Sequence, residues 1–350
     1  MKYIIVSTYI LFIFILEFFL NPVFARTGMW VVRDRLTTPA QIDSVIEYAK
    51  AKNISDIFVQ VRGRGRVLFK SQYEAMEFGI TTFDPLGYII EKTQNTDIKI
   101  HAWVNVYLIW SRDQKPEEPN HPFNRFKDYI LSDVHNNQLD EIYTNYIKKR
   151  KVEGYYLSPA EPQVHNYLLN LFKELVMKYK INGVHFDYFR YPSNKFIMDM
   201  KFLNYLSNRY HFKLTVDSNR EMSLLLARPI SEFLSSYRSW LQSYYPEVEL
   251  SVAVKPDPEE AVSRFFQNWS EWVKTDKVDF VCLMAYTNRM DTFRRNIFAV
   301  STDFPEKRKL WIGLGVYNKS MPAINMQMKI LREAGFENYL FFSYKYLKKF

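Results

Sequence analysis

The chain has 350 residues, a formal net charge of +9 and a hydrophobic fraction of 47%, which are typical of a folded protein with one large α/β domain or two smaller ones. The basic excess favours an anionic neighbour such as a cell-wall polymer, while the lack of any recognition motif excludes nucleic acid as the expected partner. Aromatic residues make up 17% of the chain. We expect most of these rings in the core and some of them in a groove, because amphipathic rings stack on sugar faces.

Residues 1–25 have the pattern of an export signal. Lys2 precedes a long apolar stretch, and "VFA" ends in the small residue Ala25. Glu17 interrupts the stretch, so an uncleaved membrane anchor is the alternative, with membrane contact through this segment alone. We expect an exported protein, periplasmic or extracellular, in which residues 26–350 form a single domain and a monomer. Its one cysteine, Cys282, lies in an apolar run and is expected to be buried and inert.

Short apolar strands alternate with amphipathic helices after the signal. Thr38-Pro39 and Asp84-Pro85 supply an N-cap followed by a proline at the first helical position, which marks two helix starts. The predicted strands are 28–33, 56–62, 98–106, 183–187, 249–255, 279–286, 309–317 and 338–344. The predicted helices include 40–53, 85–94, 163–180, 258–274 and 323–335, with further helical material over 195–245.

Eight near-continuously apolar strands separated by helices favour a parallel sheet closed into a (β/α)8 TIM barrel. No glycine-rich dinucleotide turn follows the first strand, which disfavours an open doubly wound sheet. The stretch from Tyr107 to Pro162 is a long, charged, proline-broken loop after strand three, with a polar helical piece near 135–150. The helix after the eighth strand is expected to be short or absent.

Active sites of such barrels lie at the carboxyl ends of the strands. The fourth strand, "GVHFD", ends at Asp187, and a charge at the end of a buried strand costs free energy unless a partner or a reaction uses it. Side chains alternate along a strand, so His185 shares a face with Asp187 one layer below it. The alternative for Asp187 is a structural ion pair with Arg190 or Arg62, or a cap on the following turn.

Glycoside hydrolysis needs two carboxyl groups, one ionised and one protonated. We predict Asp187 as the ionised nucleophile or base, with Glu161 or Asp257 as the proton donor and Asp34, after the first strand, as a third option for the partner. The first two have a competing role at a helix start, Glu161 as a solvated charge and Asp257 as an N-cap. Trp103, Tyr188, Tyr286 and Tyr317 are the predicted sugar platforms, and the predicted polar contacts are Arg62, Asn105, His185 and Arg190.

The run "RGRGR" (62–66) lacks the lysine and the Ser/Thr of a phosphate loop. Arg62 is a candidate for a substrate carboxylate, such as a lactyl or uronic group, whereas Arg64 and Arg66 are expected at the surface. No His/Asp/Glu cluster has the spacing of metal ligands, so neither a metal nor another cofactor is expected.

Several segments together resemble the glycosyl-hydrolase-like family ten. They include "GMWVVRD", "IFVQVRGRGRVLF", "KIHAWVNVY" and the stretch from "LSPAEPQ" to "GVHFDYFRYP". The resemblance covers about Gly28 to Tyr346 and implies an exported (β/α)8 glycosidase, in a family with one branch that acts on peptide-free glycan strands of peptidoglycan. It places Asp187 at the first of two adjacent acidic positions, where Tyr188 replaces the second.

A weaker likeness is to chitinase-type barrels, whose fourth strand ends Asp-x-Asp-x-Glu. Here those positions read His185, Asp187 and Phe189, so the acid is missing. We therefore predict a hydrolase of a bacterial cell-wall or related polysaccharide, and the favoured candidate substrate is the glycan of peptidoglycan. The alternatives are a glycan-binding barrel without catalysis and a substrate-assisted N-acetylhexosamine hydrolase.

Overall fold

The computed structural model describes residues 25–80, 82–131, 152–193 and 220–348, together with residues 202, 204 and 208. The predicted export signal lies outside these residues, apart from Ala25 at its end. Within the described part of the chain, no helix is both long enough and apolar enough to cross a bilayer. The first strand begins at Thr27.

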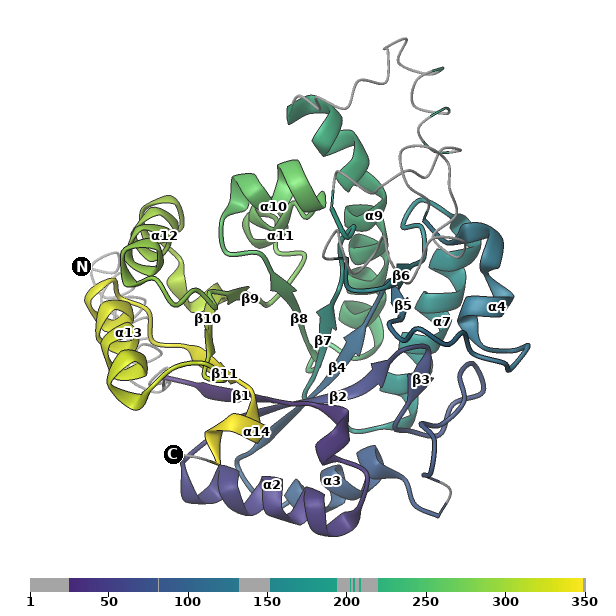
Figure 1. Cartoon of the computed structure of the whole chain (residues 1–350), viewed down its shortest axis with the longest axis horizontal. Coiled ribbons are helices and arrows are strands. Elements are labelled where there is room, and N and C mark those ends of the chain that lie inside the picture. Colours follow the sequence, from purple (N-terminus) through teal and green to yellow (C-terminus); the bar gives the residue numbers. More distant parts are fainter. Residues whose placement is uncertain are drawn as a thin grey trace, which may run out of the picture.

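Eight parallel strands form a closed barrel at the centre of the molecule (Figure 1). The first strand pairs with both the second and the last, and this double pairing closes the sheet. The predicted (β/α)8 barrel is thus confirmed, with all eight strands near their predicted positions. The barrel strands are β1 (Thr27–Val31), β2 (Asp56–Gly63), β4 (Lys99–Asn105), β7 (Gly183–Asp187), β8 (Glu249–Val254), β9 (Phe280–Met284), β10 (Leu310–Gly315) and β11 (Tyr339–Phe342).

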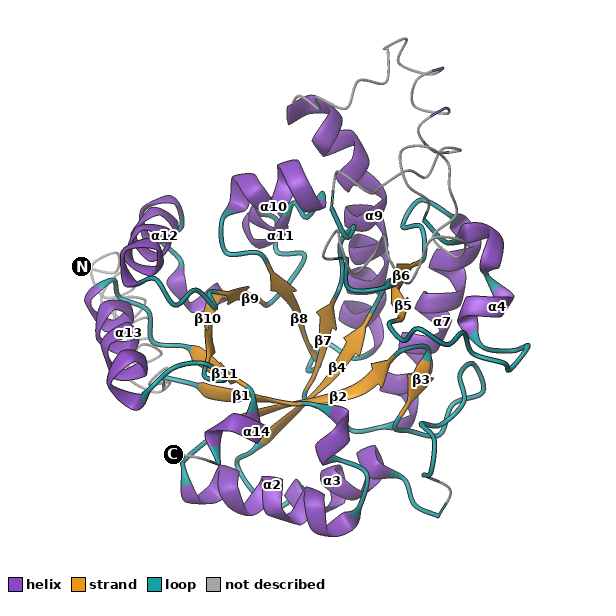
Figure 2. Cartoon of the chain, viewed as in Figure 1, coloured by secondary structure: helices purple, strands orange, loops and turns teal. Residues whose placement is uncertain are grey.

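Helices surround the strands on all sides (Figure 2). The predicted starts are confirmed, because the Thr38 side chain accepts a hydrogen bond from the Gln41 N–H and Asp84 accepts one from the Gly87 N–H. The helices are α2 (Pro39–Ala51), α3 (Pro85–Thr93), α7 (Pro162–Lys178), α9 (Arg220–Tyr244), α10 (Pro258–Phe265), α11 (Trp269–Lys274), α12 (Met290–Asp303), α13 (Met321–Glu333) and α14 (Tyr344–Leu347).

Two of the predictions about helices have clear outcomes. The single helix expected over 258–274 is wrong, because Phe266 has a left-handed backbone (φ 50°) and ends α10 before α11 begins. The final helix α14 has four residues, which confirms the short last helix.

The predicted long loop after the third barrel strand contains short ordered elements. They are β5 (Leu108–Trp110), α4 (Pro122–Arg125), the 3-10 turn η2 (Lys127–Tyr129) and β6 (Tyr155–Tyr156). The strands β5 and β6 pair antiparallel, so the end of this loop lies beside its beginning, next to the end of β4. The helical piece expected near 135–150, and most of the material expected over 195–219, lie outside the described residues.

The core has two parts. Aromatic side chains fill the barrel interior, while aliphatic side chains dominate the layer between the strands and the helices. Cys282 is fully buried in the interior, as predicted. The interior set is Trp30, Phe58, Trp103, Phe280, Cys282, Trp311 and Leu340.

The end of β2 departs from regular alternation. Its register against β4 shifts between Gln60 and Arg62, so Arg62 pairs with Val104, a residue of the outer core layer. Such a bulge turns the following side chain to the other face of the sheet. The chain then reverses through Arg64 and Gly65, both with positive φ, into the short antiparallel strand β3 (Arg66–Val67). Two such residues are what a tight hairpin turn requires.

Candidate active site

Asp187 ends β7 at the carboxyl edge of the barrel and is partly exposed. Its Oδ2 accepts a hydrogen bond from the indole N–H of Trp103 at 3.1 Å. Its Oδ1 accepts one from the backbone N–H of Tyr188 at 2.7 Å, and Tyr188 itself has a left-handed backbone with φ 50°. Strain of this kind persists where surrounding contacts hold it, and active sites are a common place for it.

Arg62 and Arg190, the two cations considered for Asp187 from the sequence, pair with other acids. Within the described residues, no lysine, arginine or histidine lies within ion-pair distance of the Asp187 carboxyl. Burial is therefore the dominant influence, and it raises the pKa of Asp187 from 3.8 to about 6 against the lowering effects of Tyr188, Arg190 and Trp103. A carboxyl group with that pKa can hold a proton near neutral pH, as a general acid must.

This pKa predicts how stability depends on pH. The folded-state pKa of Asp187 exceeds the ordinary value of 3.8, so the unfolded chain ionises first and folding loses stability as pH rises from about 4 to about 6. Replacing Asp187 by Asn should therefore stabilise the protein at pH 7 by on the order of 1–3 kcal/mol. Urea unfolding at pH 3.5 and pH 7 measures the effect. An equal difference between variant and wild type at both pH values would contradict it.

A second carboxylate reaches the barrel mouth from the segment before β6. Glu153 forms an ion pair with Arg190 at 2.7 Å and accepts a hydrogen bond from the Tyr156 hydroxyl at 3.1 Å. Burial acts to raise the pKa of Glu153, but Arg190, a backbone hydrogen bond and Lys255 together hold that pKa below its ordinary value. The charge of Glu153 in turn raises the pKa of Asp187. The two carboxyl groups thus interact electrostatically, and their surroundings shift their pKa values in opposite directions.

Lys255 follows β8 and belongs to the same group. Burial lowers its pKa, as does the charge of Arg190, whereas Glu153 and Asp187 act in the opposite direction. Its ammonium lies 4.5 Å from the ring centre of Phe265. Sequence reasoning placed Lys255 at a strand end and gave it no role, and it missed Glu153 altogether. Only the antiparallel return of β6 along β5 brings Glu153 to the barrel mouth, and no local pattern signals that pairing.

Aromatic rings form a wall on the other side of the mouth, at the ends of β9, β10 and β11. Tyr286 stacks on Phe342 with ring centres 5.4 Å apart, and Tyr317 stands perpendicular to both rings. Tyr317 is 42% exposed, and Tyr286 is partly exposed. Burial raises the pKa of Tyr286, and the next cause is the charge of Asp187, so this ring lies near the carboxyl. Tyr188 is also partly exposed beside it.

Five predicted contact residues are more buried than expected. Trp103 is 4% exposed, so its ring orients Asp187 and offers little face to a sugar. His185 is fully buried, accepting from the Trp30 indole at 3.2 Å and bonding Ser251 at 2.9 Å. The other three, Arg62, Asn105 and Arg190, are 0%, 5% and 3% exposed.

Arg62 is the clearest correction. Its side chain lies between the barrel and α7, where it pairs with Glu74 at 2.5 Å and donates to the carbonyl of Val106 at 3.0 Å. Both side chains of the Arg62–Glu74 pair are fully buried. The bulge in β2 explains the outcome, because it points Arg62 away from the mouth. A substrate carboxylate cannot reach it there.

The two main predicted partners of Asp187 lie at helix starts. Asp257 is exposed and caps α10, accepting from the Glu260 N–H at 2.8 Å. Glu161 precedes α7 as its N-cap residue, although its side chain accepts no capping hydrogen bond. Neither acid is among the main influences on the pKa of Asp187.

One buried group of acidic and histidine side chains has the closeness of metal ligands. Among the described residues, Asp56, His101 and Glu249 bring ligand atoms within 4.8 Å of one another. The guanidinium of Arg26 bonds both carboxylates, Glu249 at 2.8 Å, and so supplies the positive charge that a cation would bring. These residues lie at the amino ends of the strands, the face that serves stability in such barrels.

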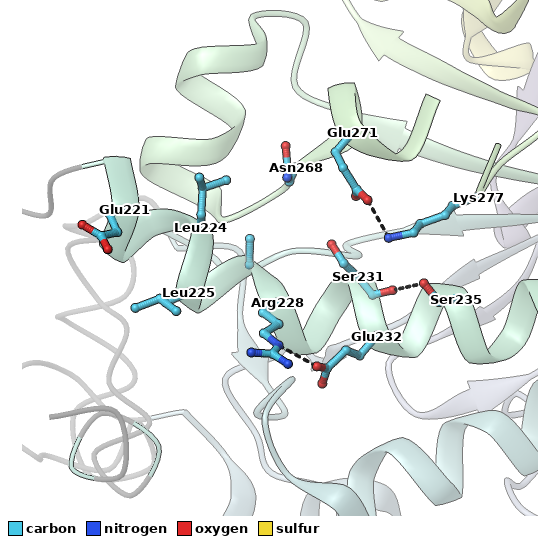
Figure 3. Close-up of a pocket in the computed structure, with 11 residues that line it drawn as sticks. Glu221, Leu224, Leu225, Arg228, Ser231, Glu232, Ser235, Asn268, Glu271 and Lys277 are labelled. Carbon is cyan, nitrogen blue, oxygen red and sulfur yellow. Dashed lines mark hydrogen bonds and ion pairs between the residues drawn. The ribbon is translucent and has the colours of Figure 1, made fainter. Parts of the chain in front are cut away.

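A pocket of about 440 Å³ lies between α9 and α11 on the outside of the barrel (Figure 3). Its walls carry their own ion pairs, Arg228 with Glu232 at 2.8 Å and Lys277 with Glu271 at 2.6 Å. No residue at the carboxyl end of a barrel strand lines it. The pocket is therefore separate from the Asp187 site.

A (β/α)8 barrel with carboxyl groups and tyrosine rings at its mouth is an architecture found among glycoside hydrolases. The chain belongs to the family described as Glycosyl hydrolase-like 10, whose profile matches residues 26–330. This confirms the family that the sequence motifs indicated.

Curated relatives are distant. Glycosyl hydrolase DigH of Escherichia coli O6:H1 (strain CFT073) is 22% identical over 83% of this chain and 68% of its own length. Glycosyl hydrolase YngK of Bacillus subtilis (strain 168) is 23% identical over 42% of this chain and 27% of its own length.

Two solved structures share the fold. The PgaB (BpsB) glycoside hydrolase domain from Bordetella bronchiseptica superposes with a TM-score of 0.71 at 15% identity, over 93% of this chain and 96% of that one. Alpha-L-fucosidase isoenzyme 2 from Paenibacillus thiaminolyticus gives a TM-score of 0.62 at 12% identity, over 92% of this chain and 46% of that one.

Proposed function

We propose that this protein is a glycoside hydrolase of a bacterial cell-wall or related polysaccharide. The favoured candidate substrate is the peptide-free glycan strand of peptidoglycan. The observation that carries the proposal is the pair Asp187 and Glu153 at the barrel mouth, with pKa values displaced in opposite directions. Family membership supports the same class of reaction. The predicted export signal supports a cell-wall location of the substrate.

In the proposed reaction, Asp187 is the general acid that protonates the glycosidic oxygen as the bond to the sugar carbon breaks. Glu153 is the ionised carboxylate, kept charged by Arg190. It acts either as the base for an attacking water or as the nucleophile, according to the separation of the two groups in the substrate complex. This assignment differs from the sequence prediction, which made Asp187 the ionised group, because burial favours the protonated form of Asp187.

The aromatic wall would bind the sugar chain. Tyr286 lies near Asp187, and Tyr317 presents exposed ring surface next to Tyr286. Stacking on a sugar face combines apolar contact with a hydroxyl able to hydrogen-bond. Trp103 is a positioning residue in this scheme, since its indole N–H fixes the Asp187 carboxyl.

Digestion of purified glycan strands with mass analysis of the products tests the proposal. We expect new reducing ends with the wild-type chain. We expect Glu153→Gln to lower kcat about 10²–10⁴-fold, because the amide cannot serve as base or nucleophile. Glu161→Gln and Asp257→Asn are the matched variants and should stay within a few-fold of wild type.

Two outcomes would redirect the assignment. A large loss in Glu161→Gln or Asp257→Asn, with Glu153→Gln active, would transfer the role of second carboxylate to that residue. Saturable binding of glycan strands without new reducing ends, even on long incubation, would favour the glycan-binding barrel without catalysis.

A further inference from the structure

Three arginines stand at the barrel mouth outside the proposed catalytic pair. Arg33 begins the 3-10 turn η1 (Arg33–Arg35) after β1, Arg64 occupies the β2–β3 turn, and Arg112 follows β5. These segments follow β1, β2 and β4, three strands that are adjacent in the barrel. The arginines therefore gather on one side of the mouth.

Their positive charge is only partly compensated. Glu77 is the one carboxylate in ion-pair contact with this group among the described residues, with its Oε2 3.4 Å from Arg33 and 3.9 Å from Arg64. Arg33 and Arg64 thus share one carboxylate, and Arg112 adds a third positive charge beside them. Burial, together with the charges of Arg64 and Arg112, lowers the pKa of Arg33 to about 10 against the effect of Glu77.

The Arg33 guanidinium is held in place, and its hydrogen bonding is incomplete. A Cβ at Gly63 would lie 2.4 Å from its Nη1 and 3.6 Å from the Asn105 side chain, so the guanidinium lies over the Gly63 backbone close to Asn105. The Arg33 Nη1 lies 3.4 Å from Glu77 Oε2 in an ion pair, yet within the described residues it makes no well-aligned hydrogen bond. A bound acceptor aligned with this donor would add the missing hydrogen bond.

The position relates this group to Asp187. Asn105 pairs in register with Asp187 across β4 and β7, and Gly63 ends the neighbouring strand β2. Gly63, under the Arg33 guanidinium, is therefore two strand spacings, about 10 Å, from Asp187. A single oligosaccharide can contact both Arg33 and Asp187.

We propose that Arg33, Arg64 and Arg112 form an anionic subsite that binds a carboxylate carried by the glycan substrate. Guanidinium groups match a carboxylate in bidentate geometry, and an acidic sugar substituent would balance the excess charge. The subsite rests on the proposed function, since it presumes a glycan in the groove. It replaces Arg62, which the fold buries, as the group that recognises an acidic substituent.

Binding to the full chain in an Asp187→Asn background tests the subsite without requiring turnover. The probes are an oligosaccharide of peptide-free glycan strands that bears carboxylates, and the same oligosaccharide with its carboxylates reduced to alcohols. We expect calorimetry to show at least about tenfold tighter binding of the carboxylate form. Adding Arg64→Gln and Arg112→Gln should bring the two dissociation constants within about twofold, with binding of the reduced form unchanged. Arg289→Gln, at an exposed arginine of the α12 start, is the matched control.

Equal binding of the two probes by the parent would overturn the subsite, as would a preference that survives the double variant or a failure to bind the carboxylate probe. Arg33→Lys gives a second test that keeps the charge but removes the fork, and it should also weaken the preference. A wild-type chain that shows the preference but cleaves no glycan would refute the proposed hydrolase and leave the subsite standing.

Discussion

Replacing Asp187 by Asn is expected to lower kcat for glycan hydrolysis about 10²–10⁴-fold, the usual contribution of a positioned proton donor. The side chains have the same shape, and the amide oxygen can still accept the Trp103 hydrogen bond, so the loss would report the missing proton. Release of reducing ends from purified strands measures it. In the wild type, kcat/KM should fall as pH rises through about 6, where Asp187 loses its proton.

Asp303→Asn is the matched control, because it makes the same change at an exposed position at the end of α12. It should leave both kcat and the pH profile unaltered. Full activity of Asp187→Asn would remove Asp187 from the reaction. A large loss of activity together with a lower unfolding temperature would point to a structural role, contrary to the stabilisation expected at pH 7.

Replacing Arg62 by Leu is expected to destabilise the protein by about 3–5 kcal/mol, because it leaves the fully buried carboxylate of Glu74 without its counter-ion. The loss should appear as a lower midpoint of urea unfolding with little change in slope. Glycan affinity at a temperature where the variant stays folded should be unchanged. The result would separate a structural arginine from a substrate contact.

The double variant Arg62→Leu with Glu74→Leu should recover much of this loss, since it removes both charges. Arg289→Leu breaks an exposed pair with Asp291 and should leave the unfolding midpoint in place. If Arg62→Leu weakened glycan binding while stability stayed at the wild-type value, the buried position of Arg62 would be wrong.

Local patterns were sufficient for the barrel. Each strand is a short apolar run, and each early helix start carries a capping side chain and a proline within a few residues, so no distant contact is needed to recognise them. The break at Phe266 was missed because apolar spacing continues through it. The left-handed helix end at Phe266 cannot be predicted from the spacing of apolar residues.

Asp187 was found by the same means, since a carboxylate at the end of an apolar strand is visible in the sequence and strand direction places it at the barrel mouth. The protonation state of Asp187 could not be predicted from the sequence. The direction of a pKa shift depends on burial and on charges brought together from β7, β8 and the segment before β6. Because burial raises this pKa, the proposed reaction makes Asp187 the proton donor, whereas the sequence prediction made it the ionised group.

The fold class, the family and the position of one carboxyl group could be predicted without coordinates, because they depend on periodicity and on residues close together in the chain. The partners of the charged side chains depended on how the chain folds. A one-residue bulge turned Arg62 from the mouth to Glu74, and an antiparallel return brought Glu153 to Arg190. Ion pairs form between groups that folding brings together, and their distance along the chain does not predict them.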